Sequence, residues 1–189
     1  MGKSAIPSNA FLCPMPMTVV SAVVAGKVNH LAVAWVSRTN HKPPMIGIAL
    51  GRSHLTNRGI REHGEFGVSI PSVDQVAEAD YVGLVSGAEV DKSGVFAVFY
   101  GSLPHAPMIA SCPVTMACRL VQVVDLPTNE FLIGEIVEAY CEEDCLTDGQ
   151  PDPLKIRPFT LTMPDNRYWR LGSFAGRAWS IGEGYRPKA

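Results

Sequence analysis

The sequence predicts a mainly β protein, an antiparallel barrel with a few short helices attached to it. Most of its apolar runs are short and strand-like, and only two short segments have a helical composition. The segments lack the βαβ alternation of parallel-sheet proteins, and no GxGxxG motif follows a strand, which disfavours a Rossmann domain. The chain has 189 residues without an internal repeat or a Ser/Gly linker, so we expect residues 1–189 to form a single domain.

In the first part of the chain, β-rich runs alternate with turn signals. Residues 17–24 and 28–36 are apolar and flank a glycine-containing turn at 25–27. Residues 38–44, RTNHKPP, are expected to form a loop, because its two prolines cannot donate to a β-ladder. Residues 45–50 then predict a short buried strand.

Two short helices are expected next, each with its own end signals. Thr56 is predicted to cap the N-terminus of the first helix, and Gly64 stands where its C-cap should fall. The strand EFGVSI follows and is stopped by Pro71. Asp74 can cap the second helix, whose sequence QVAEADYVGLVSG closes at Gly87.

The second half of the chain is again rich in β-forming residues. Residues 114–126 and 131–144 predict a long antiparallel pair joined by a turn at 127–130. Arg119 lies among apolar neighbours, which indicates a strand with one solvated face. The tail is rich in Pro and Gly, and we expect irregular segments that pack on a core through aromatic residues, namely Tyr168, Trp169, Phe174 and Trp179.

Composition and charge disfavour several classes of function. Residues classed as hydrophobic make up 47% of the chain and charged residues 18%, so a sizeable core can form. The net charge is −2 and no basic block is present, so we expect neither a nucleic-acid partner nor a membrane-surface partner. No apolar run approaches the length of a membrane span, and the N-terminal residues do not have the pattern of a signal peptide.

The cysteines and histidines do not follow metal-binding or redox motifs. Five cysteines, an odd number without a secretory signal, favour free thiols and a cytoplasmic location. Three residues separate Cys141 from Cys145, and five separate Cys112 from Cys118, so neither pair has the CxxC spacing. The five histidines show no HExxH or other ligand spacing, so we predict no metal site and no catalytic thiol.

The start of the first predicted helix is a candidate phosphate site. The unpaired N–H groups and the positive dipole end of a helix attract anions, and Arg52, Ser53 and His54 lie just before Thr56. The planar guanidinium of Arg52 matches a phosphate edge, and the hydroxyls of Ser53 and Thr56 add neutral donors. The alternative is that Thr56 only caps the helix and that Arg52 is a solvated turn charge.

The segment WVSRTNH is a candidate site for a flat heteroaromatic ring. If the preceding strand runs into this segment, its backbone presents N–H and C=O groups at a sheet end, and Ser37 and Thr39 are small enough for close approach. The alternative is an ordinary polar loop. One short strand, about 20 Å long when extended, separates this segment from the candidate phosphate site, so a mononucleotide would fit both.

Five motifs, taken in their order and spacing, carry a family resemblance over nearly the whole chain. They are NHLAVAWVSRTNHKPPMIGIAL, SHLTNRGIREHGEFGVSIPS, DKSGVF, PVTMACRLVQVVD followed by FLIGEIVEAY, and DPLKIRPFTL followed by YWRLGS. Together they resemble the flavin reductase-like proteins of the FMN-binding split-barrel superfamily, and flavoredoxin most of all. The resemblance implies a six-stranded antiparallel split barrel of Greek-key type, a homodimer, and non-covalent FMN near the subunit interface.

The resemblance also implies which residues bind the cofactor. Asn29, Trp35, Ser53, Thr56 and Lys92 would surround the phosphate and the ribityl chain, and residues 37–41 would line the isoalloxazine edge. The complete expected set is Asn29, Trp35, Val36, Ser37, Arg38, Thr39, Asn40, His41, Arg52, Ser53, His54, Thr56 and Lys92. Outside the family context, Trp35 would be a core residue and Lys92 a surface lysine.

Other positions are open or depart from the family pattern. Tyr168 or Trp169 would cover the ring, or else pack in the core. Ser93 stands where the family often has Phe after the DK pair, and no cysteine lies between residues 35 and 44. Chemistry assisted by a thiol at the ring is therefore not expected.

Three functions compete on these grounds. The first is a flavoredoxin-like redox protein that passes electrons from NAD(P)H or a reduced protein donor to an acceptor through bound FMN. The second is an NAD(P)H:flavin oxidoreductase that uses flavin as a diffusible substrate. The third is a flavin-binding module without turnover. No side chain is identified as an acid or base, so no catalytic residue is assigned.

Overall fold

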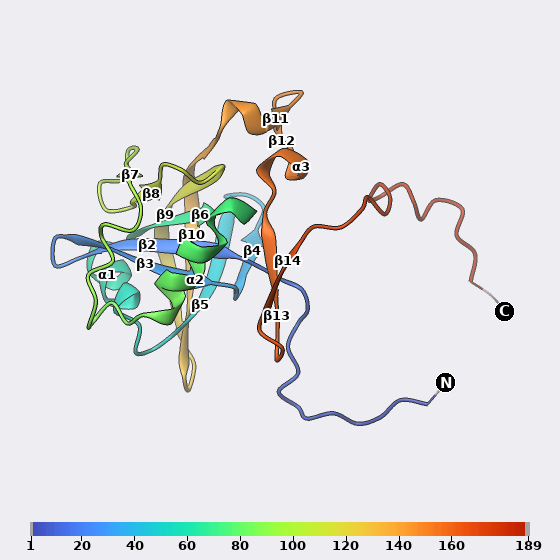
Figure 1. Cartoon of the computed structure of the whole chain (residues 1–189), viewed down its shortest axis with the longest axis horizontal. Coiled ribbons are helices and arrows are strands. Elements are labelled where there is room, and N and C mark those ends of the chain that lie inside the picture. The colour runs from blue at the N-terminus through green and yellow to red at the C-terminus, as the bar shows by residue number, and fades with distance from the viewer. Residues whose placement is uncertain (1, 188–189) are drawn as a thin grey trace.

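The computed structural model describes residues 2–187 and confirms a mainly β architecture of antiparallel strands with a few short helices (Figure 1). Its main sheet has the strand order β3-β2-β6-β9-β10-β5-β4, and all neighbours are antiparallel. The sheet is formed by β2 (Thr18–Val24), β3 (Lys27–Val33), β4 (Val36–Asn40), β5 (Met45–Gly51), β6 (Glu65–Ile70), β9 (Val114–Asp125) and β10 (Asn129–Cys141).

The barrel is split between β3 and β5. These two strands are not neighbours in the sheet order, although both line one cavity. Just beyond the end of β3, the N–H of Ala49 on β5 donates to the carbonyl of Trp35 at 2.9 Å. The edge of β3 that faces away from β2 therefore borders an opening, and this opening becomes the centre of the candidate site.

The main sheet has seven strands where six were expected, because one predicted strand is divided. The run 28–36 is interrupted at residues 34–35, after which the chain forms β4 at the edge of the sheet. The expected loop at 38–44 is therefore too long, since residues 38–40 belong to β4.

Ser37 pairs with Gly47, and a Cβ on that glycine would lie 2.6 Å from the Thr39 methyl group and 2.4 Å from the Phe131 ring. Only a glycine leaves room for this packing.

The first helix, α1 (Leu55–His63), ends as predicted but begins differently. Gly64 has a φ of 65° and its N–H donates to the Ile60 carbonyl at 2.8 Å, so the predicted C-cap is confirmed. The predicted N-cap at Thr56 is wrong, because His54 is the N-cap and makes no side-chain capping bond. Thr56 is instead buried in the first turn of α1, where its hydroxyl accepts a hydrogen bond from the Asn29 side chain on β3.

The second helical segment also starts and stops at other residues than expected. A short 3₁₀ turn, η1 (Val73–Gln75), leads into α2 (Val76–Leu84). Ser72, not Asp74, caps this segment, because its hydroxyl accepts from the Asp74 N–H while the Gln75 side chain accepts from the Ser72 N–H. The helix stops before Val85, which is extended, so the predicted end at Gly87 is wrong.

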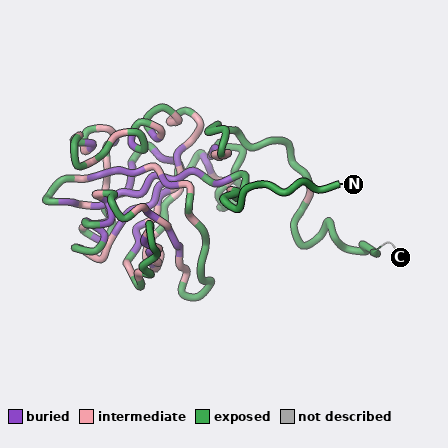
Figure 2. The backbone as a smooth tube through the Cα atoms, turned by 90° about the horizontal axis from the view of Figure 1, so that it is seen from below, coloured by how far each residue is buried: buried purple, intermediate pink, exposed green. Residues whose placement is uncertain are grey.

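Two apolar clusters hold the sheet and its covering segments together. The buried stretches of the chain lie in the body of the molecule, away from its two extended ends (Figure 2). Val20, Ile48 and Phe66 belong to the cluster inside the barrel, while Val19 and Val82 belong to the cluster between the sheet and α2. Adjacent residues of β2 thus enter different clusters, and β2 is buried on both faces. This explains why its sequence, TVVSAVV, is apolar without a two-residue alternation.

The predicted β9–β10 hairpin is confirmed, and Arg119 is exposed on it. The remaining elements are short and surround the barrel. They are β1 (Met15–Pro16), β7 (Val98–Phe99), β8 (Met108–Ile109), η2 (Glu143–Cys145), β11 (Leu146–Thr147), β12 (Gln150–Pro151), α3 (Pro153–Ile156), β13 (Phe159–Thr162) and β14 (Arg167–Arg170). No helix within residues 2–187 is long and apolar enough to cross a bilayer.

Both ends of the chain extend away from the barrel (Figure 1). The tail therefore differs from the expectation that its aromatic residues pack on a core. Tyr168 does pack, edge-on against Phe159 with ring centroids 5.3 Å apart. Trp169 is half exposed, and Phe174 and Trp179 are 80% and 98% exposed in this chain.

Candidate functional site: the split of the barrel

Two adjoining cavities occupy the split. The first, which we call the split pocket, has a volume of about 260 Å³ and lies between residues 31–35 and residues 49–51. The second, the helix-end pocket, has a volume of about 270 Å³ and lies between the start of α1 and the residues that follow α2. Leu31 and His54 line both cavities, so the two form one groove along the open edge of β3.

Lys92 gives the helix-end pocket a buried positive charge. The residue is only 2% exposed, and its ammonium group donates to the carbonyls of Val82 at 2.8 Å and His30 at 3.1 Å. Burial lowers the pKa of Lys92, and within residues 2–187 no carboxylate forms an ion pair with it. A buried charge with only neutral partners is costly, and an anion in the adjoining pocket would offset that cost. An anion is therefore the kind of ligand that the charge of this pocket would favour.

Asn29 and Thr56 connect the sheet to the helix inside the same pocket. The amide nitrogen of Asn29 on β3 donates to the Thr56 hydroxyl at 2.8 Å, and both residues are buried. Because the hydroxyl accepts this bond, its hydrogen remains available for an acceptor in the pocket. Gly87 closes the wall, since a Cβ there would lie 2.2 Å from the Asn29 side-chain oxygen.

Ser53 and His54 line the pocket at the start of α1. The first N–H groups of a helix lack partners within the helix, so they add donors beside the Thr56 hydroxyl. Burial, and after it the positive charge of Lys92, lowers the pKa of His54, which favours the neutral imidazole. Five predicted residues are thus brought together around one pocket: Asn29, Ser53, His54, Thr56 and Lys92.

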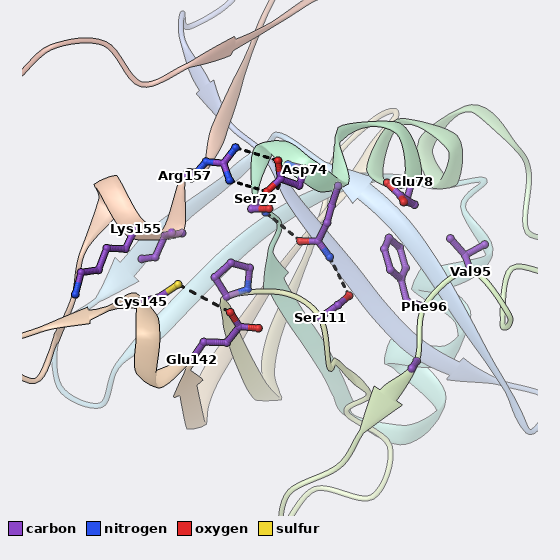
Figure 3. Close-up of a pocket in the computed structure, with 14 residues that line it drawn as sticks. Ser72, Asp74, Glu78, Val95, Phe96, Ser111, Glu142, Cys145, Lys155 and Arg157 are labelled. Carbon is purple, nitrogen blue, oxygen red and sulfur yellow. Dashed lines mark hydrogen bonds and ion pairs between the residues drawn. The ribbon is translucent and has the colours of Figure 1, made fainter.

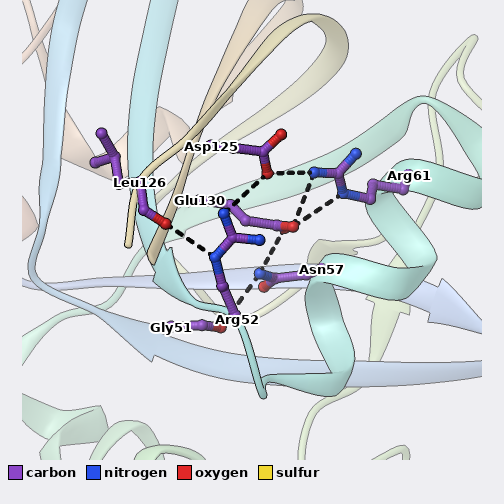
Figure 4. A network of polar contacts seen from close by, with 7 residues as sticks. All are labelled: Gly51, Arg52, Asn57, Arg61, Asp125, Leu126 and Glu130. Carbon is purple, nitrogen blue, oxygen red and sulfur yellow. Dashed lines mark hydrogen bonds and ion pairs between the residues drawn. The ribbon is translucent and has the colours of Figure 1, made fainter. Parts of the chain in front are cut away.

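Arg52, which was predicted to bind the phosphate, is not brought to this pocket (Figure 4). Its Nε donates to the Leu126 carbonyl at 2.9 Å, and its Nη2 lies 3.3 Å from a carboxylate oxygen of Asp125. The Asp125 carboxylate already pairs with the Arg52 guanidinium, and the Leu126 carbonyl in the turn after β9 holds the side chain away from the pocket. The expectation that Arg52 would meet a phosphate is therefore not supported by its position.

Trp35, which the resemblance assigns to the phosphate and ribityl chain, lies in the wall between two cavities. Trp35 is 46% exposed, so the alternative that it is a core residue is wrong for this chain. On one side it lines the split pocket, and on the other it lines a larger cavity of about 660 Å³ together with Val36 and Ser37. The opposite wall of this larger cavity, which we call the arm pocket, is formed by residues 9–12 and 14–16 of the N-terminal segment.

The other predicted ring contacts lie further along β4. Because β4 is at the edge of the sheet, the backbone groups on the side away from β5 have no strand partner. Arg38 Nε donates to the Asn40 carbonyl and the Asn40 side chain donates to the Pro43 carbonyl, both at 2.8 Å, which holds the exposed end of the strand. Arg38, Thr39, Asn40 and His41 are exposed here and do not line the arm pocket.

Several lining residues were not expected from the sequence. Residues 83–87, GLVSG, line the helix-end pocket, although their sequence was interpreted only as a helix end. Gly87 was the available signal, because a residue without a Cβ allows the backbone to approach Asn29. Residues 9–16 and Phe131 of the arm pocket carry no comparable sequence signal.

A further polar cavity of about 490 Å³ lies outside the groove and contains none of the predicted residues (Figure 3). Arg157 pairs with both carboxylate oxygens of Asp74, at 2.6 and 2.9 Å. Gln75 accepts from the Ser72 N–H and donates to the Ser111 hydroxyl. These bonds tie the segment after α3 to the start of α2, which is a structural role. Among the residues that the structure describes, no cluster of three or more His, Cys, Asp or Glu could hold a metal.

Comparison with known proteins agrees with this architecture. The chain is 49% identical to flavoredoxin from Methanosarcina acetivorans, with a TM-score of 0.95 and coverage of 97% of this chain and 98% of that one. Flavoredoxin of Desulfovibrio vulgaris (Miyazaki F) is 31% identical, with a TM-score of 0.89 and coverage of 97% and 100%.

A more distant relative is the reductase component of a 4-nitrophenol 4-monooxygenase/4-nitrocatechol 2-monooxygenase from Rhodococcus opacus. It is 28% identical over 123 residues, which span 65% of this chain and 64% of that protein. Residues 10–168 match the flavin reductase like domain, and they include the residues that line the split pocket and the helix-end pocket. This chain belongs to the flavin reductase-like family of split-barrel proteins.

Proposed function

We propose that this protein binds FMN non-covalently in the groove along β3 and uses it as a redox cofactor. The phosphate would lie in the helix-end pocket and the ring beside Trp35, with its polar edge along residues 37–41. The observation that carries the proposal is Lys92, a buried cation without a carboxylate partner in residues 2–187, in a pocket that also contains the start of a helix. That combination favours a phosphate over an uncharged ligand.

The proposed phosphate contacts divide into charge and hydrogen-bond donors. Lys92 supplies the charge, and Thr56, Ser53 and the first N–H groups of α1 supply the donors. Asn29 acts through Thr56, because its amide nitrogen holds the hydroxyl oxygen at 2.8 Å and leaves the hydroxyl hydrogen free to meet the phosphate.

At the ring, the unpaired backbone edge of β4 offers donors and acceptors to a planar heterocycle. Arg38 is near enough along the chain to place positive charge beside the polar edge, which would raise the reduction potential, and His41 could add a hydrogen bond there. The flavin itself supplies the redox chemistry, and the residues of this chain bind and orient it. No side chain is assigned a proton-transfer role.

The electron donor separates the candidate functions. Similarity to two flavoredoxins favours electron transfer between a reduced donor and an acceptor, with NAD(P)H or a redox protein as donor. Similarity to a monooxygenase reductase component favours the second candidate, an NAD(P)H:flavin oxidoreductase that releases its flavin. A flavin-binding module without turnover is the third candidate. Five free thiols support a cytoplasmic location for each of them.

The decisive experiment starts from the visible spectrum of the purified protein. We expect a flavin spectrum, and a protein stripped of flavin should bind FMN more tightly than riboflavin. NADH, NADPH and a reduced iron–sulfur protein are then added in turn under anaerobic conditions. Bleaching of retained FMN by the protein donor supports the first candidate, and rapid NAD(P)H oxidation with flavin release supports the second.

Bleaching by neither type of donor supports the binding module. A colourless protein that takes up no FMN at micromolar concentration would disprove the proposal as a whole.

We further propose a homodimer in solution. The extended segments at both ends expose large apolar side chains, including Leu12, Phe174 and Trp179, and a second copy of the chain could bury them. A mass measurement by light scattering tests this part of the proposal independently of flavin binding.

A further inference from the structure

His54 presents an imidazole to the groove at the junction of its two cavities. The side chain lines both the split pocket and the helix-end pocket. The ring packs over Gly51, where a Cβ would lie 3.4 Å from the imidazole Cε1. Although His54 is the N-cap of α1, its side chain makes no capping bond, and it forms no ion pair within residues 2–187. The imidazole is therefore available to a ligand.

Lys92 is the one charged side chain among the described residues that line these two cavities. Its ammonium group has three hydrogens, and the carbonyls of Val82 and His30 accept two of them, so one remains for the pocket. The same positive charge reaches His54, because it adds to the effect of burial in lowering the pKa of that imidazole. Without a ligand, a proton on His54 would place a second cation beside the first.

The other charged groups around α1 do not line the two cavities. Arg58, one helical turn after His54, lines another cavity beside the β2–β3 turn, together with Glu89 and Asp91. The carboxylates of the β9–β10 hairpin are already engaged, Asp125 by Arg52 and Arg61, and Glu130 by Arg61 and Asn57. A bound phosphate would thus supply the negative charge that the linings of the two cavities lack.

The charge of a phosphate would reverse the balance at His54. A phosphate monoester carries a charge of about −1.5 to −2 at pH 7, with a second pKa of about 6. A negative charge near an imidazole favours its protonated form, and the imidazolium donates from both ring nitrogens. Riboflavin has no phosphate, so it would leave the imidazole as it is in the free protein.

We propose that His54 takes up a proton from solvent when FMN binds and then holds the phosphate as a second cation beside Lys92. The inference rests on the proposed function, because it places the phosphate in the helix-end pocket. The proton joins a ring nitrogen and returns to solvent when the flavin leaves, and no other covalent bond changes. Mild acid should therefore strengthen the binding of FMN, and alkaline conditions should favour its release.

The test measures the affinity of flavin-free protein for FMN and riboflavin at pH 8 and pH 6.5. We expect the affinity for FMN to rise about fivefold toward pH 6.5 and that for riboflavin to change less than about twofold. His54→Gln, which keeps a neutral donor, should abolish most of the rise. His54→Lys, with a permanent charge, should bind FMN with similar affinity at both pH values.

His105→Gln is the matched control, because His105 is half-buried and lines neither cavity of the groove. It should keep the wild-type rise in FMN affinity. Titration calorimetry in two buffers with different enthalpies of protonation counts the proton directly. We expect an uptake of about half a proton per FMN at pH 7 in the wild-type protein, and none with riboflavin or in His54→Gln.

The outcomes separate this inference from the function on which it rests. If FMN binds with the same affinity at both pH values, or if His54→Gln shows the wild-type rise, the inference is wrong and the proposed function stands. An equal rise for riboflavin would also overturn the inference, because the proton would then have no link to the phosphate. If FMN binds at neither pH, the proposed function fails first.

Discussion

The side-chain amide of Asn29 donates to the hydroxyl of Thr56 at 2.8 Å, across the boundary between the open edge of β3 and the first turn of α1. The two residues are 27 positions apart in the chain, and both are buried. The bond holds the hydroxyl oxygen in the helix-end pocket, which Lys92 also lines, and it leaves the hydroxyl hydrogen free for a ligand. This contact therefore joins the barrel edge to the helix at the place where we propose that the phosphate binds.

Thr56→Val should lower both the stability of the protein and its affinity for FMN. It leaves the buried Asn29 amide without its acceptor, which costs about 1–3 kcal/mol of unfolding free energy. It also removes one proposed donor to the phosphate, so FMN affinity should fall by about tenfold while riboflavin affinity changes little. Chemical denaturation and flavin titration measure the two effects.

Thr56→Ser is the matched control, because it keeps the hydroxyl, and it should retain most of both properties. Equal losses of FMN and riboflavin affinity in Thr56→Val would contradict the assignment of Thr56 to the phosphate.

Lys92→Met should separate ligand binding from stability. Removing a buried cation that has only carbonyl partners leaves the free energy of unfolding of the flavin-free protein unchanged or higher. FMN affinity should fall by about 10- to 100-fold, and riboflavin affinity should be unaffected.

Lys42→Met, at an exposed position in the turn before β5, provides the control for loss of a lysine charge. If FMN affinity is the same in Lys92→Met and the wild-type protein, the phosphate does not lie in the helix-end pocket.

The fold class was predictable from the sequence because alternating runs, turn residues and the absence of βαβ rhythm are local signals. In residues 28–36 these local signals do not predict the strand boundaries correctly. Nothing local distinguishes one long strand from two strands divided near Trp35, because the division depends on the pairing of β4 with β5, which the Ala49–Trp35 bond extends. The extra strand of the main sheet follows from that long-range contact.

The candidate site was predictable in part for the same reason. Ser53, His54 and Thr56 are adjacent in the chain, so their convergence at a helix start could be expected. Arg52 has the same local context, yet it turns to Asp125, whose position depends on the register of the β9–β10 hairpin. The role of Lys92 came only from the family resemblance, since its burial depends on packing against α2.

A further prediction concerns the network that holds α1 to the β9–β10 hairpin (Figure 4). Glu130 is 7% exposed, and its carboxylate accepts from Arg61 at 2.8 and 3.1 Å and from Asn57 at 2.8 Å. Glu130→Gln should lower the free energy of unfolding by about 1–2 kcal/mol at pH 7, a value reduced by the partial exposure of Arg61. Glu135→Gln, on the same strand and without an ion pair in the described residues, should change it little.

The pH dependence of this effect has a defined direction. The hydrogen bond from Arg61 is the main cause that lowers the pKa of Glu130 below its ordinary value of 4.5. The contribution is therefore present above pH 4.5 and is lost as the pH falls through the lower value of the folded state. Glu130→Gln and the wild-type protein should converge in stability at acid pH, and a constant difference would contradict the role of the ionised carboxylate.

His30 should make the protein sensitive to mild acid. Its ring is fully buried, Nδ1 lies 2.7 Å from the Ser21 hydroxyl, and burial followed by the charge of Lys92 lowers its pKa from 6.5 to about 4. Between these two values the unfolded chain binds the proton more readily, so stability falls as the pH falls. The loss between pH 7 and pH 5 should be about 2 kcal/mol.

Denaturation of wild-type protein and His30→Gln at the two pH values tests this prediction. The variant should be less stable at pH 7, because it disturbs the bond to Ser21, but it should lose less stability on acidification. Equal losses in the two proteins would show that another group carries the pH dependence.

Removal of residues 171–189 should convert the proposed dimer into a monomer. The described part of this segment, 171–187, extends from the barrel and exposes Phe174, Trp179 and Ile181 at 80%, 98% and 71%, and such surface needs a partner in water. The truncation leaves the core untouched, because β14 ends at Arg170, so the midpoint of thermal unfolding of the barrel should fall only by the contribution of the interface.

Light scattering should give the single-chain mass for the truncated protein and twice the single-chain mass for the full chain. Trp179→Ala should shift the equilibrium in the same direction, whereas Leu154→Ala, which removes an exposed side chain on α3, should not. A full-length chain that remains monomeric at high micromolar concentration would contradict the homodimer and leave these side chains without the proposed partner.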